Sequence, residues 1–354
     1  MKFFHNIYIA ILVLILSISI FSYSLYHYCL TGTSNDNSLK TIEIKPGSID
    51  SIATTLKEKN FIRNKLAFKV YIKLTGQTNL KAGIYSLSKD MGVIELVNTL
   101  EKGSNSSDLK ITFKEGLNMR QIASLIEEKT NNTSDALYNV LKDKEYLKSL
   151  IDEYWFLTDD ILNDKIYYSL EGYLFPNTYF FSSEDVTIET IIETMLDETK
   201  KQLEDYKDKI ENNDYSIHEL LTMASIVEKE GILSSDRKIM ADVLYKRLDR
   251  NWSLGCDVTT YYGLKINQGD KDANELDLNG CNDDYNTRCA TFKGLPVSPI
   301  CNPSIDAIKA AIEPKKTKYM YFQADKNGKI YFAKTNDEHN SIKAKLEREG
   351  LIGH

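Results

Sequence analysis

The feature that most constrains this chain is an uninterrupted apolar segment close to its first residue. Residues 7–30 (IYIAILVLILSISIFSYSLYHYCL) contain no Lys, Arg, Asp or Glu. A helix of about 20 apolar residues is enough to cross the hydrocarbon core of a bilayer. The segment is longer than the apolar region of a usual signal peptide, and no Ala-x-Ala-like cleavage site follows it. The sequence therefore predicts a membrane anchor over residues 1–30, with a cleaved signal peptide as the alternative.

The charges on either side of this segment predict its orientation. Lys2 and the terminal amine precede it, and residues 31–39 beyond it carry no Lys or Arg. Basic residues are enriched on the cytoplasmic side of membrane spans. We therefore expect a single-pass protein of the cell membrane with a cytoplasmic N-terminus. Residues 31–38 (TGTSNDNS) would form a polar linker to an extracytoplasmic remainder.

Length and composition describe that remainder as folded and globular. The chain has 354 residues, 42% hydrophobic and 27% charged, which is enough for two domains beyond the anchor. The formal net charge is −7. A general nucleic-acid binder needs a basic face, so we expect no nucleic-acid partner.

Hydrophobic periodicity predicts an α+β fold with an internal near-repeat. Residues 41–60 and 111–130 each contain alternating apolar positions, a glycine turn and then helical spacing. The segment 80–104 predicts a strand, a turn and an amphipathic helix. Asn327-Gly328 predicts the turn of a β-hairpin over residues 319–335. Helices are also expected within 133–165 and at 187–210, 217–230, 236–249 and 308–316, the last ended by Pro314.

The segment 216–231 (SIHELLTMASIVEKEG) carries explicit signals for the start and end of one helix. Ser216 is a favourable N-cap, and Glu219 three residues later completes a capping-box pattern. Gly231 stands where a glycine commonly ends a helix.

Glu230 falls in the last turn of this helix, where the helix dipole is negative and favours an uncharged carboxyl. Its neighbours on the helical wheel are Met223, Ile226 and Val227, so partial burial would raise its pKa further. A carboxyl that stays protonated near neutral pH can donate a proton to a glycosidic oxygen. The alternative is an ordinary solvated glutamate at a fraying helix end.

Eight segments resemble, in order, the MltG/YceG-like endolytic murein transglycosylases over roughly residues 40–345. They are EGYLFPNTY (171–179), ASIVEKEG (224–231), VLYKRL (243–248), CDVTTYYG (256–263), YNT (285–287), GLPVSPICNPS (294–304), AAIEPKKTKYMYF (310–322) and EHN (338–340). The resemblance implies a small LysM-like α+β module, a connecting strand-helix region and a mixed α/β catalytic domain. We place these at residues 39–105, 106–170 and 171–348. Contact of the module with glycan is implied, and simple structural spacing accounts for it equally well.

The resemblance also implies the chemistry. A lytic transglycosylase cleaves the MurNAc-GlcNAc bond by attack of the muramyl 6-hydroxyl on its own anomeric carbon, which leaves a 1,6-anhydro end. One carboxyl can serve as acid and then as base, because the nucleophile is held within the substrate. The family assigns this catalytic role to the second glutamate of VEKE, Glu230, and Glu228 is expected to shape the site.

Five further residues are candidates for substrate binding on the same resemblance. Glu171 opens the EGYLFPNTY segment, and Asp257 is the best second carboxylate for steadying positive charge on the sugar. Thr259 lies in the same motif, which we expect to be a loop. Asn286 and Thr287 could bond the N-acetyl group. Loop capping by Asp257 and turn formation by the YNT segment are the competing accounts.

The chain departs from the family pattern at Asn177, where an aspartate is usual, and at Cys256 and Val258, where a Thr or Ser and a proline are usual. His339 matches the closing HN of the family, and we expect it to be a buried, hydrogen-bonded histidine before a substrate contact.

Four cysteines cluster late in the chain, at Cys256, Cys281, Cys289 and Cys301. In an exported domain such density suggests one or two disulfides, and four cysteines allow three complete pairings. A zinc site is the alternative, but the C-x2-C and H-x3-H spacings that would support it are missing from the sequence. We expect neither a metal nor a cofactor in the reaction.

Together these observations predict a membrane-anchored enzyme that cuts nascent peptidoglycan strands internally and so terminates glycan chains. Family membership implies glycan strands as substrate and cell-wall synthases of elongation or division as partners. A catalytically inactive, membrane-tethered glycan-binding scaffold is one alternative, because of the departures from the family pattern. A muramidase-type hydrolase with Asp257 as its base is the other.

Overall fold

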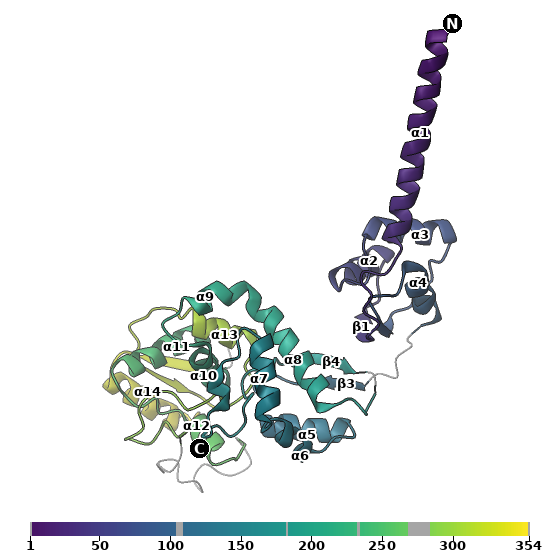
Figure 1. The fold of residues 1–354 in the computed structure, drawn as a ribbon. Helices are drawn as coiled ribbons and strands as arrows, with labels where there is room; N and C mark the ends of the chain where they lie inside the picture. The colour runs from purple at the N-terminus through teal and green to yellow at the C-terminus, as the bar shows by residue number, and fades with distance from the viewer. Residues whose placement is uncertain (1, 104–108, 182, 232–233, 268–283, 353–354) are drawn as a thin grey trace. The chain divides into compact units, whose positions relative to one another are not determined.

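The structure is a computed structural model that describes residues 2–103, 109–181, 183–231, 234–267 and 284–352. It divides into two compact units, Met1–Lys110 with Phe180–Glu184, and Ile111–Tyr179 with Asp185–His354. Figure 1 shows the order of the helices and strands along the chain. The mixed helix and strand content agrees with the expected α+β class.

The first unit begins with α1, Lys2–Cys29. Its stretch Leu12–Cys29 is long and apolar enough to cross a membrane, the one such helix in the described part of the chain. By length and composition a signal sequence would pass the same test.

After α1, the described residues up to Lys102 form two antiparallel strands and three helices. They are β1 (Lys40–Ile44), α2 (Ile49–Glu58), α3 (Lys65–Thr75), β2 (Gly83–Leu87) and α4 (Val93–Lys102). Lys40 pairs with Leu87 and Ile44 pairs with Gly83. One hydrophobic core joins the inner faces of these strands and helices, and Leu30 at the end of α1 is part of it. The strand and amphipathic helix predicted within 80–104 are confirmed as β2 and α4.

The second copy of the near-repeat is β3 (Leu109–Thr112) followed by α5 (Met119–Lys129). Equivalent positions are buried in both copies, since Ile52, Ala53 and Leu56 of α2 correspond to the buried Ile122, Ala123 and Ile126 of α5. The predicted strand-turn-helix repeat is therefore confirmed. β3 pairs with β4 (Thr178–Phe181) in a two-stranded sheet. Between them lie α6 (Ser134–Val140), α7 (Lys144–Glu153) and the 3-10 turn η1 (Asp159–Leu162).

The rest of the second unit is mainly helical. It contains α8 (Ile188–Leu203), η2 (Glu204–Tyr206), α9 (Lys207–Glu211), α10 (Ile217–Glu230), α11 (Ser234–Asp249), α12 (Asp257–Gly263), α13 (Ile305–Ile312), β5 (Tyr321–Ala324), β6 (Ile330–Ala333) and α14 (Asn336–Arg348). Helix α10 packs against α11, α12 and α13 (Figure 1). Every residue of α10 from Ile217 to Val227 except Glu219 is buried, so this helix forms the centre of the unit.

Two expectations need correction. The helix expected over 187–210 is interrupted, because α8 ends at Leu203 and a 3-10 turn separates it from α9. The CDVTTYYG segment, expected to be a loop, is helix α12, whose apolar and tyrosine side chains are buried. The β5–β6 hairpin and the helix before Pro314 are confirmed.

Candidate active site

Helix α10 begins and ends where the sequence predicted. The Ser216 hydroxyl accepts a hydrogen bond from the Glu219 N–H at 3.2 Å, and the Glu219 carboxylate accepts one from the Ser216 N–H at 2.8 Å. The capping box is therefore confirmed. Gly231 caps the other end at φ −115°, an extended backbone. A Cβ there would lie 3.1 Å from Arg237, Met240 and the Val227 carbonyl, so close packing rather than a left-handed turn favours glycine.

Glu230 lines a cavity of about 570 Å³ in the second unit. The last turn of α10 supplies Glu230, and the start of α12 supplies Asp257 and Val258. Arg247 comes from α11, and the β5–β6 hairpin and α14 form the remaining wall. Several segments that are distant in sequence thus surround one carboxyl group.

The environment of Glu230 raises its pKa to about 7. Burial is the largest cause, because an ionised carboxylate loses hydration there. The negative charge of Asp257 adds to the increase in pKa, whereas Arg247, Arg288 and a hydrogen bond from the Cys256 thiol oppose it. The predicted direction of the shift is confirmed, and near neutral pH this group can both donate and accept a proton.

Asp257 is the first residue of α12 and forms an ion pair with Arg288. Both side chains are partly exposed and both line the Glu230 cavity. The structure therefore brings Asp257 and Glu230 together, as expected of the second carboxylate.

Glu228 lies on another side of α10 and does not line this cavity. Its carboxylate is 2.8 Å from the Arg237 guanidinium and accepts a hydrogen bond from the Ser304 N–H at 3.0 Å. Because Ser304 is the N-cap of α13, Glu228 ties α10 to the start of that helix. These contacts are structural, and they fix the position of α10 against α11 and α13.

Glu171 is also away from the cavity, with 1% of its surface exposed. It accepts hydrogen bonds from the Met119 N–H at 2.9 Å, the Tyr262 hydroxyl at 3.0 Å and the Asn302 amide at 3.1 Å. Burial raises its pKa to about 7. Glu171 thus links the start of α5, helix α12 and Asn302. Its side chain does not line the cavity, so it cannot contact a ligand there.

Thr259, Asn286 and Thr287 are buried in one hydrogen-bond network. The hydroxyls of Thr259 and Thr287 are 2.9 Å apart, and Thr260 donates to the Asn286 side chain at 2.6 Å. Thr287 also accepts from the Cys256 N–H at 3.0 Å. The network fastens the start of α12, and none of the three expected substrate contacts lines the cavity.

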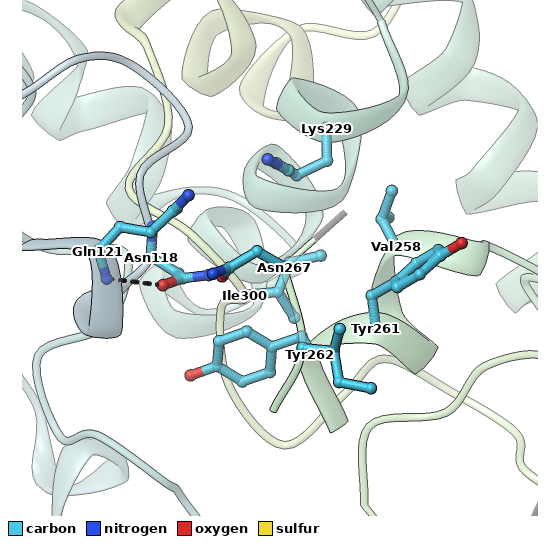
Figure 2. A pocket seen from close by; sticks show the side chains of 9 residues that line it. Asn118, Gln121, Lys229, Val258, Tyr261, Tyr262, Asn267 and Ile300 are labelled. Carbon is cyan, nitrogen blue, oxygen red and sulfur yellow. Dashed lines mark hydrogen bonds between the residues drawn. The ribbon is translucent and has the colours of Figure 1, made fainter. Parts of the chain in front are cut away.

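A second cavity of about 50 Å³ adjoins the first, since Lys229 and Val258 line both. Figure 2 shows Lys229 above it, with Asn118 and Asn267 on one side and Val258 and Tyr261 on the other. A cavity of this size holds one small substituent rather than a sugar ring.

Sequence reasoning missed most of the cationic residues that line the larger cavity, namely Lys229, Arg247, Arg288, Lys326 and Lys343. Lys229 and Arg247 lay in segments that resemble the family, and the other three carried no signal of spacing or periodicity. His339 also lines the cavity. Its ring stacks on Tyr321, but its buried Nδ1 has no partner among the described residues, contrary to the expected buried, hydrogen-bonded histidine.

Cys256 and Cys301 are free and buried, whereas Cys289 is disulfide-bonded. Two bridges among the four late cysteines are therefore excluded. Cys281 lies outside the described residues. No group of three or more His, Cys, Asp or Glu side chains within the described ranges could hold a metal ion.

Residues 42–345 match the YceG-like family. The chain is 34% identical to the endolytic murein transglycosylase of Bacillus subtilis, covering 91% of this chain and 89% of that protein. It is 32% identical to the endolytic murein transglycosylase of Streptococcus pneumoniae D39, covering 94% of this chain and 63% of that protein.

A crystal structure of a yceG-like protein from Listeria monocytogenes superimposes with a TM-score of 0.61 at 36% identity. It covers 86% of this chain and 99% of the Listeria chain. The family match spans most of the chain and includes every residue that lines the Glu230 cavity. The chain belongs to the YceG-like family.

Proposed function

We propose that this protein is a membrane-anchored lytic transglycosylase that cuts nascent peptidoglycan strands internally and so terminates glycan chains. The observation that carries the proposal is Glu230, a carboxyl with a pKa of about 7 on the wall of a cavity of about 570 Å³. The names of the relatives from Bacillus subtilis and Streptococcus pneumoniae support the same activity.

In the proposed reaction the Glu230 carboxyl donates its proton to the oxygen that bridges MurNAc and GlcNAc. The bond between that oxygen and the anomeric carbon breaks, and GlcNAc leaves with a free hydroxyl. The muramyl 6-hydroxyl then attacks the anomeric carbon and gives up its proton to the Glu230 carboxylate. The acid is regenerated, water is not consumed, and the product carries a 1,6-anhydro ring.

Asp257 would stabilise the positive charge that develops on the sugar ring during this step. Its ion pair with Arg288 holds the carboxylate on the cavity wall. The same negative charge raises the pKa of Glu230, which keeps the acid protonated before the sugar arrives. One aspartate thus serves two purposes.

The N-terminal unit would hold the catalytic unit close to the membrane. Helix α1 supplies a single-pass anchor with a cytoplasmic N-terminus, which limits cleavage to a layer next to the bilayer. The order β1-α2-α3-β2 with antiparallel strands is consistent with a LysM-like module that contacts glycan. Cell-wall synthases of elongation or division would deliver the strands.

A hydrolase is the second candidate, because Asp257 is partly exposed in the same cavity and could activate a water molecule. Product analysis separates the two. Full-length protein in detergent is incubated with uncross-linked strands, and the new ends are weighed by mass spectrometry. Anhydro ends support the lytic reaction, and reducing ends support the hydrolase. Binding without new ends would instead support a scaffold.

A further inference from the structure

The Glu230 cavity is rich in positive charge although the whole chain is acidic. The chain carries a formal net charge of −7. Five cationic side chains nevertheless line the cavity, Lys229, Arg247, Arg288, Lys326 and Lys343, against three carboxyl groups, Glu230, Asp257 and Asp325. A surplus of cations in a concave site attracts an anionic ligand.

The carboxyl groups do not cancel this surplus. Asp257 is paired with Arg288. Asp325 accepts hydrogen bonds from the N–H groups of Asn327 at 2.9 Å and Lys329 at 3.0 Å within the hairpin turn. Glu230 stays largely protonated below its pKa of about 7. Asp257 thus offsets one cation, Arg288, and Asp325 remains ionised, but the cavity still holds more cations than carboxylates when Glu230 is protonated.

Lys326 and Lys343 are the two exposed cations on one wall of the cavity. Lys326 belongs to the turn between β5 and β6, and Lys343 lies one turn after His339 on α14. Neither forms an ion pair with the described residues. The pKa of His339 is lowered first by burial and then by the positive charges of Arg247 and Lys343 nearby.

A glycan strand offers anionic groups of two kinds. The sugar rings are neutral, but the peptide stems on muramyl residues end in free carboxylates and recur at every disaccharide. A lipid diphosphate occurs only at the growing end. An enzyme that cuts internally meets stem carboxylates at whichever bond enters its cavity, so carboxylates are the ligand that fits this position.

We propose that Lys326 and Lys343 bind the ionised carboxylates of peptide stems, so that the enzyme selects strands whose stems are free acids over strands whose stems are amidated. This inference rests on the proposed function. In it, the wall formed by the hairpin and α14 recognises the peptide stem and not the sugar. Lysine ammonium groups suit this task as mobile point charges.

The test compares two preparations of uncross-linked strands, one with free stem carboxyls and one in which those carboxyls have been converted to amides. For the full-length protein we expect a lower KM on the free-acid strands and a KM that rises with salt. The variant Lys326→Gln/Lys343→Gln should raise KM on free-acid strands roughly five- to twentyfold, as expected for two exposed ion pairs. Its KM on amidated strands should change much less than its KM on free-acid strands.

Lys329→Gln is the matched control. Lys329 lies in the same hairpin, but its ammonium group sits 4.8 Å above the Tyr331 ring and does not line the cavity. This variant should behave as wild type. Equal losses on free-acid and amidated strands, or no loss in the double variant, would overturn the proposal. A loss confined to strands that carry a terminal diphosphate would overturn it in favour of the diphosphate.

Binding measurements separate this proposal from the catalytic one. Glu230→Gln should bind free-acid strands more tightly than amidated strands even though it does not cleave them. Adding Lys326→Gln/Lys343→Gln to that variant should abolish the difference in Kd. If wild-type protein forms no new ends while this difference in Kd persists, the catalytic proposal fails and the stem-recognition proposal stands. Equal Kd values for free-acid and amidated strands would contradict stem recognition, whether or not the protein cleaves them.

Discussion

The Arg237 guanidinium lies 2.8 Å from the Glu228 carboxylate, and both side chains are about nine-tenths buried. Two residues later, Glu230 faces a cavity instead. Residues two apart on an α-helix differ in direction by about 200°, so the two glutamates of the VEKE motif face different surroundings. One holds helices together, and the other is available for chemistry.

Substitution of these glutamates should therefore separate stability from activity. Glu228→Ala leaves the buried Arg237 charge without its carboxylate partner and should lower the free energy of unfolding by about 3 kcal/mol. Glu230→Gln should keep the fold and abolish anhydro-muramyl ends. Thermal unfolding and product mass spectrometry on the same preparations measure both effects. Normal cleavage by Glu230→Gln would rule out its assignment as the acid.

Activity should depend on pH through Glu230. Its pKa of about 7 means that the proton needed by the leaving oxygen is lost as pH rises through 7. We expect kcat/KM to fall tenfold per pH unit on the alkaline side. An alkaline limit set near the usual glutamate pKa of about 4.3 would contradict the burial of this group.

The same carboxyl should affect stability, with a sign that follows from linkage. Its folded pKa of about 7 lies above the unfolded value, so its contribution is present at low pH and is lost as pH rises through 7. Glu230→Gln removes this loss and should stabilise the protein at pH 8 by up to about 3 kcal/mol, with a much smaller gain at pH 5. Unfolding curves at the two pH values check the difference, and equal effects at both would count against it.

Cys256 should tune the acid. Its thiol is one of the groups that lower the pKa of Glu230, and it also donates a hydrogen bond to the Leu254 carbonyl at 3.7 Å. Cys256→Ala should move the alkaline limit of kcat/KM upward by roughly half a pH unit, because a bond to the charged form is lost. Cys256→Ser keeps a hydrogen-bond donor, so its alkaline limit should equal that of the wild type or lie below it. Cys301→Ala is the control, since that thiol bonds to the Ser225 carbonyl and its removal should leave the pH profile unchanged.

Glu171 should matter for folding rather than for substrate affinity. Glu171→Ala removes three hydrogen bonds, from Met119, Tyr262 and Asn302, and should lower the free energy of unfolding by about 2–4 kcal/mol. Chemical denaturation measures this change. A raised KM with unchanged stability would instead support the ligand contact expected from its motif.

Local features of this chain could be predicted because local physics decides them. Ser216 and Glu219 satisfy the free N–H groups of α10 within one turn, so these four residues (216–219) are enough to predict where the helix begins. Asn327-Gly328 likewise predicted the β5–β6 hairpin. Helix α12 was missed because its segment contains two threonines and two tyrosines, which are poor helix formers, and burial against α10 overrides that preference.

The candidate site residues were predicted only in part, because their positions in space depend on the tertiary structure. Motif resemblance selected Glu230 and Asp257, which the fold brings to one cavity, together with Glu171 and Thr287, which it buries elsewhere. A motif marks residues that matter without saying whether they contact a ligand or brace those that do. Hydrogen-bond partners and exposure separate the two cases.

The order of residues was sufficient for the apolar N-terminal segment, the repeated strand-helix unit, and the capped helix with Glu230 at its end. These depend on neighbours within a few positions of one another. Tertiary structure alone decided the pKa of Glu230, the separate task of Glu228 and the cationic wall around the cavity. Burial and charge act through space, and the groups responsible come from α10, α11, α12, a hairpin and α14, which no periodicity along the chain connects.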